Sequence, residues 1–323
     1  MTKIFLPAAF LMVSLNAQAE GKMESPRGKP IVRIFTDFHA QLGKHPEDVG
    51  FELNRSYLGY TYTVAPNLTF TGILDVGQSK QVDDYHRIAY IKNIMVEWKH
   101  QKLTLKAGLL PTIQFGFQEK FWGLRYVHKS FQDQYKFGHS ADLGITARYT
   151  FNKVLTAEAI LANGEGYKKV QLNDGLLYGA GVTVSPLSSW SLRLYGGINQ
   201  DVGEEKKDIY NLSLFTGYRH RFFSVGAEYN LQKEKTTEDI RSPQGYSIYT
   251  SATINQYLSL FGRYDKFQAA RESDKELDEK QYLIGAQISF NKYIRIAPTC
   301  TITQKNNGTQ PQYGAGIYCY LGF

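Results

Sequence analysis

This 323-residue sequence has two groups of side chains that could do chemistry, and the first lies in one aromatic-rich segment. Residues 115–139 are the longest stretch without strand-like alternation, and they hold eight aromatic side chains. Seven of its ionisable side chains are candidates for a constriction, namely Glu119, Lys120, Arg125, His128, Lys129, Asp133 and Lys136. A loop of this length is usually functional, and so many large rings are not expected to face water. We therefore expect the segment to pack against the rest of the chain and its charges to set a local electrostatic field.

A second set of charges recurs at alternate positions along the chain, which places them on one face of β-strands. The basic members are Arg33, Arg55, Arg87, Lys106, Arg148, Arg193, Arg219, Arg263 and Arg295. The acidic members are Asp37, Asp75, Glu97, Asp142, Glu158, Glu228 and Asp265. Because the two signs are nearly balanced, these residues either form cross-strand ion pairs or line a polar interior.

Other chemistry finds little support in the sequence. The seven histidines, at positions 39, 45, 86, 100, 128, 139 and 220, show no metal-ligand spacing. No Ser/His or Asp/His group assembles from neighbouring segments, as a hydrolase would require. We expect no catalytic residue, no metal, no cofactor and no nucleic-acid partner.

The elements that carry these charges are predicted to be short strands. Apolar residues alternate with polar ones in nearly every segment from Pro30 to Phe323, as in Leu143, Ile145 and Ala147. Seven tight turns alternate with eight longer polar loops, at 43–50, 78–84, 115–139, 163–174, 199–208, 232–245, 268–280 and 304–312. These fifteen connections imply sixteen strands. Asn recurs in the two-residue turns, where we expect it to adopt a positive φ.

Composition indicates that this sheet crosses a membrane. The chain is 42% apolar and 14% aromatic, and no stretch is long and apolar enough for a membrane helix. Aromatic residues lie near almost every tight turn, as in an interfacial girdle. The face predicted to point outward carries one charge, Lys92, and the strand over residues 51–64 alternates poorly enough to suggest a bulge. We predict an all-β, 16-stranded antiparallel transmembrane barrel with a water-filled interior, in a Gram-negative outer membrane.

The two ends of the chain fit an exported barrel. A short basic start, an apolar stretch and Ala17-Gln18-Ala19 predict a signal peptide over residues 1–19. Residues 20–29 then form a flexible lead-in and residues 30–323 the barrel. At the other end, Ile317, Cys319, Leu321 and Phe323 are apolar at every second position.

The sequence at this point resembles the bacterial outer-membrane porins. Three features support the resemblance. The chain ends in Phe323, and the loop at 115–139 lies between the fifth and sixth strands. The third feature is the passage from Phe121 through Lys129 to Gly144. That passage looks like the loop-to-strand region of the phosphate-selective porin O/P-like group. The resemblance implies a homotrimer in which the third outer loop folds inward to narrow the lumen. No dense row of arginines extends the resemblance to a phosphate site.

We therefore expect a porin that lets small hydrophilic solutes or ions diffuse passively, surrounded by outer-membrane lipid. Arg125, Lys129 and Lys136, facing the wall arginines, predict a weak preference for anions. Three alternatives stay open: the loop could cover the outside mouth or contact a partner subunit, the barrel could be a plugged binding or adhesion protein, or it could be an outer-membrane hydrolase.

The two cysteines lie on the last two predicted strands. Cys300 and Cys319 are equidistant from the centre of the 304–312 loop, so a symmetric hairpin would set them opposite one another. The pair could form a disulfide in an exported protein, or both thiols could face lipid.

Overall fold

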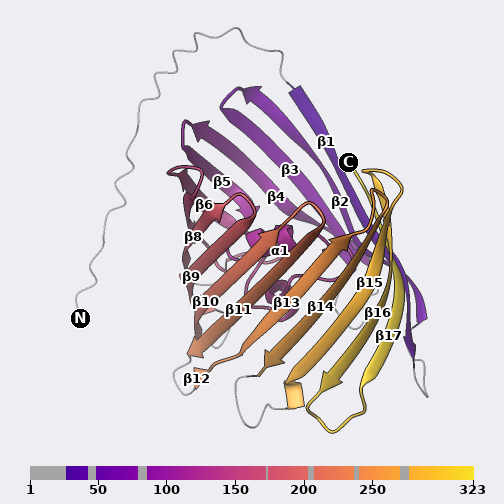
Figure 1. Ribbon diagram of the computed structural model, residues 1–323. Coiled ribbons are helices and arrows are strands. Elements are labelled where there is room, and N and C mark those ends of the chain that lie inside the picture. Colours follow the sequence, from indigo (N-terminus) through magenta and orange to yellow (C-terminus); the bar gives the residue numbers. More distant parts are fainter. Residues whose placement is uncertain are drawn as a thin grey trace.

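The computed structural model describes residues 27–42, 49–78, 86–171, 174–202, 207–235, 240–269 and 276–323. Sixteen long strands and the two-residue β12 form one antiparallel sheet (Figure 1). The strands are β1 (Arg27–Leu42), β2 (Val49–Ala65), β3 (Leu68–Gln78), β4 (Arg87–His100), β5 (Leu103–Pro111), β6 (Ala141–Thr150), β7 (Leu155–Ala162), β8 (Leu177–Leu187), β9 (Trp190–Val202), β10 (Lys207–Arg219), β11 (Phe223–Lys235), β12 (Ile240–Arg241), β13 (Gln244–Thr253), β14 (Leu258–Gln268), β15 (Glu279–Ser289), β16 (Ile294–Lys305) and β17 (Gln312–Gly322). Among the described residues, no helix is long and apolar enough to cross a membrane.

The first and last long strands close the sheet into a barrel. β1 pairs with β2 on one side and with β17 on the other, from Arg33 opposite Gly322 to Leu42 opposite Tyr313. Every other long strand pairs with its sequence neighbours, and the C-terminus lies beside β1 (Figure 1). The predicted sixteen-stranded barrel is therefore confirmed. β1 begins at Arg27, so residues 27–29 belong to the strand and not to the lead-in, and residues 1–19 lie outside the described part of the chain.

Seven tight turns join neighbouring strands, as the sequence predicted, although the turn expected at 186–188 lies at 188–189 because β8 continues to Leu187. Their asparagines act differently from the prediction. Asn152, Asn255 and Asn291 have no positive φ; among described non-glycine residues only Gln101, Lys136 and Asp201 do. Each of these asparagines instead accepts two backbone N–H hydrogen bonds through its side-chain oxygen, at 2.8 and 2.9 Å. Asn is favoured in these turns because its short side chain can replace a backbone acceptor.

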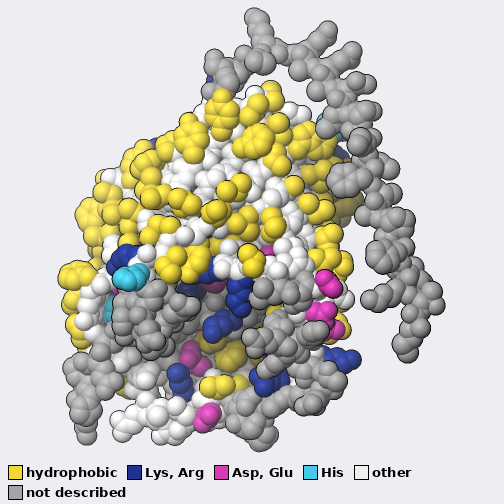
Figure 2. Space-filling model, turned by 180° about the vertical axis from the view of Figure 1, so that it is seen from behind, with side chains coloured by type: hydrophobic (Ala, Val, Ile, Leu, Met, Phe, Trp, Pro, Cys, Tyr) yellow, Lys and Arg dark blue, Asp and Glu magenta, His cyan; other side chains and the backbone are white. Residues whose placement is uncertain are grey.

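The strands expose one face and bury the other. On β10, Leu212 and Leu214 are 42% and 48% exposed, whereas the intervening Ser213 and the following Phe215 are 2% and 4% exposed. Hydrophobic side chains cover the outside of the barrel in the same way (Figure 2). All the aromatic residues predicted to form the girdle near the tight turns are exposed except Trp98, which stacks on His100. A hydrophobic outer surface of this extent fits a wall that contacts lipid.

Two bulges change which side chains face inward. In β2, the register shift opposite Phe35 and Thr36 leaves Asn54 without a partner residue, which confirms the predicted bulge. In β4, a shift opposite Ile73 and Leu74 skips Lys92. As a result Lys92 and Asn93 both turn inward between the exposed Ile91 and Ile94. The prediction that Lys92 faces outward was wrong, because strict alternation does not survive an inserted residue.

Of the two alternatives for Cys300 and Cys319, the strand register excludes the disulfide. The β16–β17 hairpin pairs Cys300 with Ala315 and Cys319 with Ile296, so the thiols are offset by four residues. Four residues of strand span roughly 13 Å, well beyond the roughly 7 Å limit for bridged Cα atoms. Both thiols are free, and Cys300 is exposed on the outer side.

Candidate functional site: a charged cavity beside the longest loop

The longest connection in the barrel is the segment between β5 and β6, residues 112–140, which we call the long loop. It contains two short helices, α1 (Gly116–Trp122) and α2 (Phe131–Gln134). α1 ends at Gly123, whose φ of 74° is a left-handed conformation that glycine adopts without a Cβ clash.

Aromatic side chains of the long loop pack on the buried faces of the strands. Trp122 lies 5.2 Å from Tyr249 of β13, between ring centroids, and Phe121 lies 5.1 Å from Phe215 of β10. Tyr126 contacts rings at the closure of the barrel, 5.8 Å from Tyr320 of β17. These wall residues belong to the face opposite the exposed hydrophobic belt.

Buried amides also attach the long loop to β10. Gln118 and Gln132 both donate to the hydroxyl of Ser213, at 3.1 and 3.0 Å. The amide of Gln114 donates to the side chain of Gln132 and to the carbonyl of Phe137. A buried amide that lost its acceptor would be costly, so this network fixes the position of the loop.

Three arginines of the wall hold carbonyl groups of the loop. Arg263 donates to Lys129 O at 2.7 Å, Arg193 to Ile113 O at 2.7 Å and Arg219 to Phe121 O at 2.6 Å. The positive charges of Arg263 and Arg193 are compensated by carboxylates. Arg263 pairs with Asp265 at 2.7 Å and Arg193 with Glu158 at 2.6 Å. These predicted wall residues therefore act first as supports of the loop.

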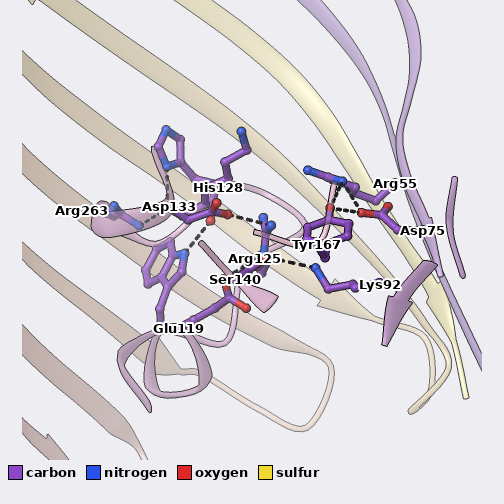
Figure 3. Close-up of polar contacts among 12 residues, drawn as sticks. Arg55, Asp75, Lys92, Glu119, Arg125, His128, Asp133, Ser140, Tyr167 and Arg263 are labelled. Atoms are coloured by element: carbon purple, nitrogen blue, oxygen red, sulfur yellow. Dashed lines mark hydrogen bonds and ion pairs between the residues drawn. The ribbon is translucent and has the colours of Figure 1, made fainter. Parts of the chain in front are cut away.

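Within the loop, Arg125 lies between two carboxylates. Its guanidinium is 2.8 Å from Glu119 and 2.7 Å from Asp133 (Figure 3). Burial lowers the pKa of Arg125, but the two carboxylates outweigh burial and raise it, so the arginine stays charged. Burial raises the pKa of Glu119, and Arg125 opposes that rise. The triad brings together three residues that the sequence proposed for a constriction.

A second polar cluster joins β2, β3, β4 and the loop before β8. Arg55 and Tyr167 both bind the carboxylate of Asp75 (Figure 3). Lys92 donates to Ser140 at 3.2 Å, and its ammonium lies about 5 Å from the ring centroids of Tyr57 and Tyr167. The bulge in β4 is what allows Lys92 to join this cluster.

Between the long loop and the wall lies a cavity of about 440 Å³, which we call the charged cavity. Its charged lining consists of Asp37, Glu52, Arg55, Arg125, Lys129 and Lys168, with His39 and His128 beside them. Aromatic rings of Phe35, Tyr126 and Tyr318 complete one side. In Figure 2, Lys, Arg, Asp and Glu side chains likewise gather in a hollowed part of the surface, below the hydrophobic belt.

His128 contributes no charge to the cavity at neutral pH. Burial and the nearby Arg263 lower the pKa of His128 from its usual 6.5 to about 4. Its Nδ1 lies 3.0 Å from the carbonyl oxygen of Lys129. His128 is therefore an uncharged polar residue of the cavity lining.

The structure separates the other predicted site residues from the cavity. Lys120 and Lys136 are exposed and do not line it. Arg33 and Arg87 are exposed, Lys106 pairs with Glu97, and Arg148 with Glu158. Asp142 accepts the backbone N–H groups of Leu143 and Gly164, and Arg295 lies 4.1 Å from the ring centroid of Tyr320. These residues shape the wall and its ends.

The sequence did not indicate several lining residues of the cavity, notably His39, Glu52, Asn54 and Lys168. It also did not indicate Lys92, which joins the neighbouring cluster of Arg55, Asp75 and Tyr167. One signal was available. A lone lysine on an otherwise uncharged outer face indicates a change of register, and Lys92 was that lysine.

No protein-family model and no curated protein matches this sequence. Solved structures do match its fold. An anion-selective porin from Comamonas acidovorans superposes with a TM-score of 0.70 at 12% identity, covering 92% of this chain and 100% of that one. The fold of this chain is that of the outer-membrane porins. OmpT of Vibrio cholerae gives 0.68 at 13% identity, covering 94% and 99%, and OmpF of Salmonella typhi gives 0.67 at 10% identity, covering 92% and 97%.

Proposed function

We propose that this protein is an outer-membrane porin through which small hydrophilic solutes diffuse passively. The observation that carries the proposal is the charged cavity, which lies between the long loop and the inner wall of a closed barrel with a hydrophobic exterior. A porin needs a closed wall, a wet interior and charges at its narrowest point, and it needs no catalytic step. The proposal therefore includes no enzymatic activity.

The long loop is proposed to fold into the barrel and form that narrowest point. Its aromatic rings contact Phe215, Tyr249 and Tyr320 on the buried faces of strands from different parts of the barrel. Its Arg125 and Lys129 line the charged cavity, across which lie Asp37 and Glu52 of β1 and β2. These contacts favour an inward position over a loop that covers the outside mouth.

The proposed selectivity is a weak preference for anions. Four basic side chains line the charged cavity, against two acidic ones. The preference is expected to be weak because Asp75, Glu119 and Asp133 compensate Arg55 and Arg125. Lys129 and Lys168 are the two lysines of the cavity lining, whereas Lys136, which the sequence had proposed, lies outside it.

Planar-bilayer recordings of the refolded protein across a KCl gradient test the proposal. We expect stable open steps in the current. We also expect a reversal potential whose sign shows that Cl⁻ permeates more easily than K⁺. A Lys129→Gln/Lys168→Gln variant should shift that potential toward K⁺ selectivity, because it removes positive charge where the low-dielectric wall focuses the field. The matched control is Lys120→Gln/Lys136→Gln, which makes the same change of charge in exposed positions of the long loop.

Two outcomes would contradict the proposal. A folded barrel without conductance would favour the plugged binding protein. An equal shift in the two double variants would mean that the charged cavity does not set selectivity.

A homotrimer is proposed as the assembly. One structure of similar fold, an in-vitro folded OmpT of Vibrio cholerae at 12% identity, is described as a trimer form. Chemical cross-linking of the detergent-folded protein should give a trimer band that persists on dilution, and a band of one chain only would contradict this assembly.

A further inference from the structure

Three potential metal ligands meet on the wall of the charged cavity, on the strands that close the barrel. Asp37 and His39 are two residues apart on β1, so their side chains share the inner face. Glu52 on β2 stands directly opposite Asp37 in the strand register. One oxygen or nitrogen atom from each of the three side chains lies within 4.8 Å of the other two.

The surroundings of these side chains suit a cation. Two carboxylates directly opposite one another in a sheet repel, and here one of them, Asp37, is only 6% exposed. His39 Nδ1 lies 3.1 Å from the Asp37 carboxylate, whose second oxygen accepts the amide of Asn54 at 3.0 Å. The bulge in β2 is what brings Asn54 to this position. All four residues line the charged cavity, so an ion arriving from water would meet them.

We propose that Asp37, His39 and Glu52 form a binding site for a divalent transition-metal ion on the wall of the charged cavity. An imidazole nitrogen with two carboxylate oxygens is a donor set that Zn²⁺ and its neighbours accept. Zinc ligands at about 2.0–2.2 Å from the ion lie at most about 4.4 Å apart, so small side-chain shifts bring the three atoms into range. Asn54 orients the Asp37 carboxylate by donating a hydrogen bond to the oxygen that does not contact His39.

The site has a direct consequence for transport, which rests on the proposed function. A bound divalent cation adds two positive charges where the cavity wall carries its acidic residues. It would thus remove the negative charge that faces Arg125 and Lys129 and narrow the space beside them. Zinc is expected to reduce the current through the open barrel.

Calorimetric titration of Zn²⁺ into the detergent-folded barrel tests binding without any need for conductance. One saturable site is expected in the wild type. His39→Ala and Glu52→Gln should each lower the affinity at least about tenfold, and Asn54→Ala by about tenfold or more, as loss of outer-shell partners does. His220→Ala and Glu97→Gln are matched controls, because they remove one imidazole and one carboxylate elsewhere and should leave the affinity unchanged.

The absence of saturable binding, or equal binding by wild type, His39→Ala and Glu52→Gln, would overturn the site. Circular dichroism and the heat-dependent gel shift of each variant confirm that it is folded. In bilayers, micromolar Zn²⁺ should reduce the wild-type current and a chelator should restore it. A block that persists in His39→Ala would contradict the role of this site in the current, whereas a barrel that binds Zn²⁺ but never conducts would contradict the porin proposal alone.

Discussion

Arg263 shows how one residue can serve the wall and the long loop at once. Its guanidinium makes two hydrogen bonds to Asp265, at 2.8 and 2.7 Å, and a third to the carbonyl of Lys129. Arg263 is 6% exposed and Asp265 only 1%. A buried ion pair is not strongly stabilising by itself, but the loss of one partner leaves a buried charge without compensation.

Arg263→Leu is therefore expected to lower the free energy of unfolding by about 3–5 kcal/mol, measured by urea titration in lipid vesicles. The double variant Arg263→Leu/Asp265→Leu should recover most of this loss, because no uncompensated carboxylate remains. Arg148→Leu is the control, since its side chain is 58% exposed and Glu158 keeps Arg193 as a partner. An equal loss in the control would show that burial is not the cause.

His128 gives a prediction about pH. Its folded-state pKa of about 4 lies below the ordinary value of 6.5, so the unfolded chain takes up this proton first. The contribution of His128 to stability is present above pH 6.5 and is lost as the pH falls toward 4. The stability of the wild type should thus fall more steeply over this range than that of His128→Gln.

Unfolding midpoints measured in steps from pH 7.5 to pH 4 provide the comparison. His220→Gln, in an exposed turn, should keep the wild-type slope. Identical slopes for wild type and His128→Gln would show that this imidazole is already accessible to protons in the folded barrel.

At the scale of elements, a single hydroxyl group of β10, that of Ser213, holds both short helices of the long loop. Ser213 is 2% exposed and accepts hydrogen bonds from Gln118 in α1 and from Gln132 in α2. One hydroxyl therefore fixes both short helices. Neither helix is long enough to be stable without such contacts.

Ser213→Val should release both amides and lower the free energy of unfolding by about 1–3 kcal/mol, the cost of buried donors without acceptors. The loop should also move more, which single-channel recordings would show as more frequent current fluctuations. Ser259→Val, at a half-buried position of β14, is the control. Quiet channels with unchanged stability in Ser213→Val would mean that the aromatic contacts suffice to hold the loop.

The predicted strands and their turns were correct because alternation and turn residues are local signals. The bulges were harder to predict. The bulge in β2 left a trace as poor alternation, whereas that in β4 was hidden by the apolar residues on both sides of Lys92. A bulge depends on the register of the neighbouring strand, which a single strand does not specify.

At the scale of the whole molecule, the barrel depends on its hydrophobic exterior. Leu214 lies near the middle of β10 and points outward, 48% exposed, whereas Tyr218 points outward close to the tight turn. The cost of a charge on the lipid face depends on its depth in the bilayer.

Leu214→Arg should therefore destabilise the folded barrel by about 2–4 kcal/mol in lipid vesicles, and Tyr218→Arg by about 0–1 kcal/mol. Both variants add the same charge to the same face of β10, so they differ only in the depth of that charge in the bilayer. Reversible unfolding in urea measures the difference. Equal effects at both positions would contradict the placement of the lipid-contacting belt.

The sequence by itself determined the architecture of this protein. Period-2 alternation, the spacing of turns and loops, and the aromatic residues near the turns were enough for a sixteen-stranded barrel, because each is repeated along the chain. The location of the longest loop between β5 and β6 followed from the same count.

Only the tertiary structure decided which charges meet. It joined Arg125 to Glu119 and Asp133, turned Lys92 inward, set Asp37 opposite Glu52, and kept Cys300 and Cys319 apart. Lys120 and Lys136 carry the same charge as Lys129, yet only Lys129 lines the charged cavity. The physical reason is that pairing depends on register and on loop packing, which are set by contacts between residues distant in the chain.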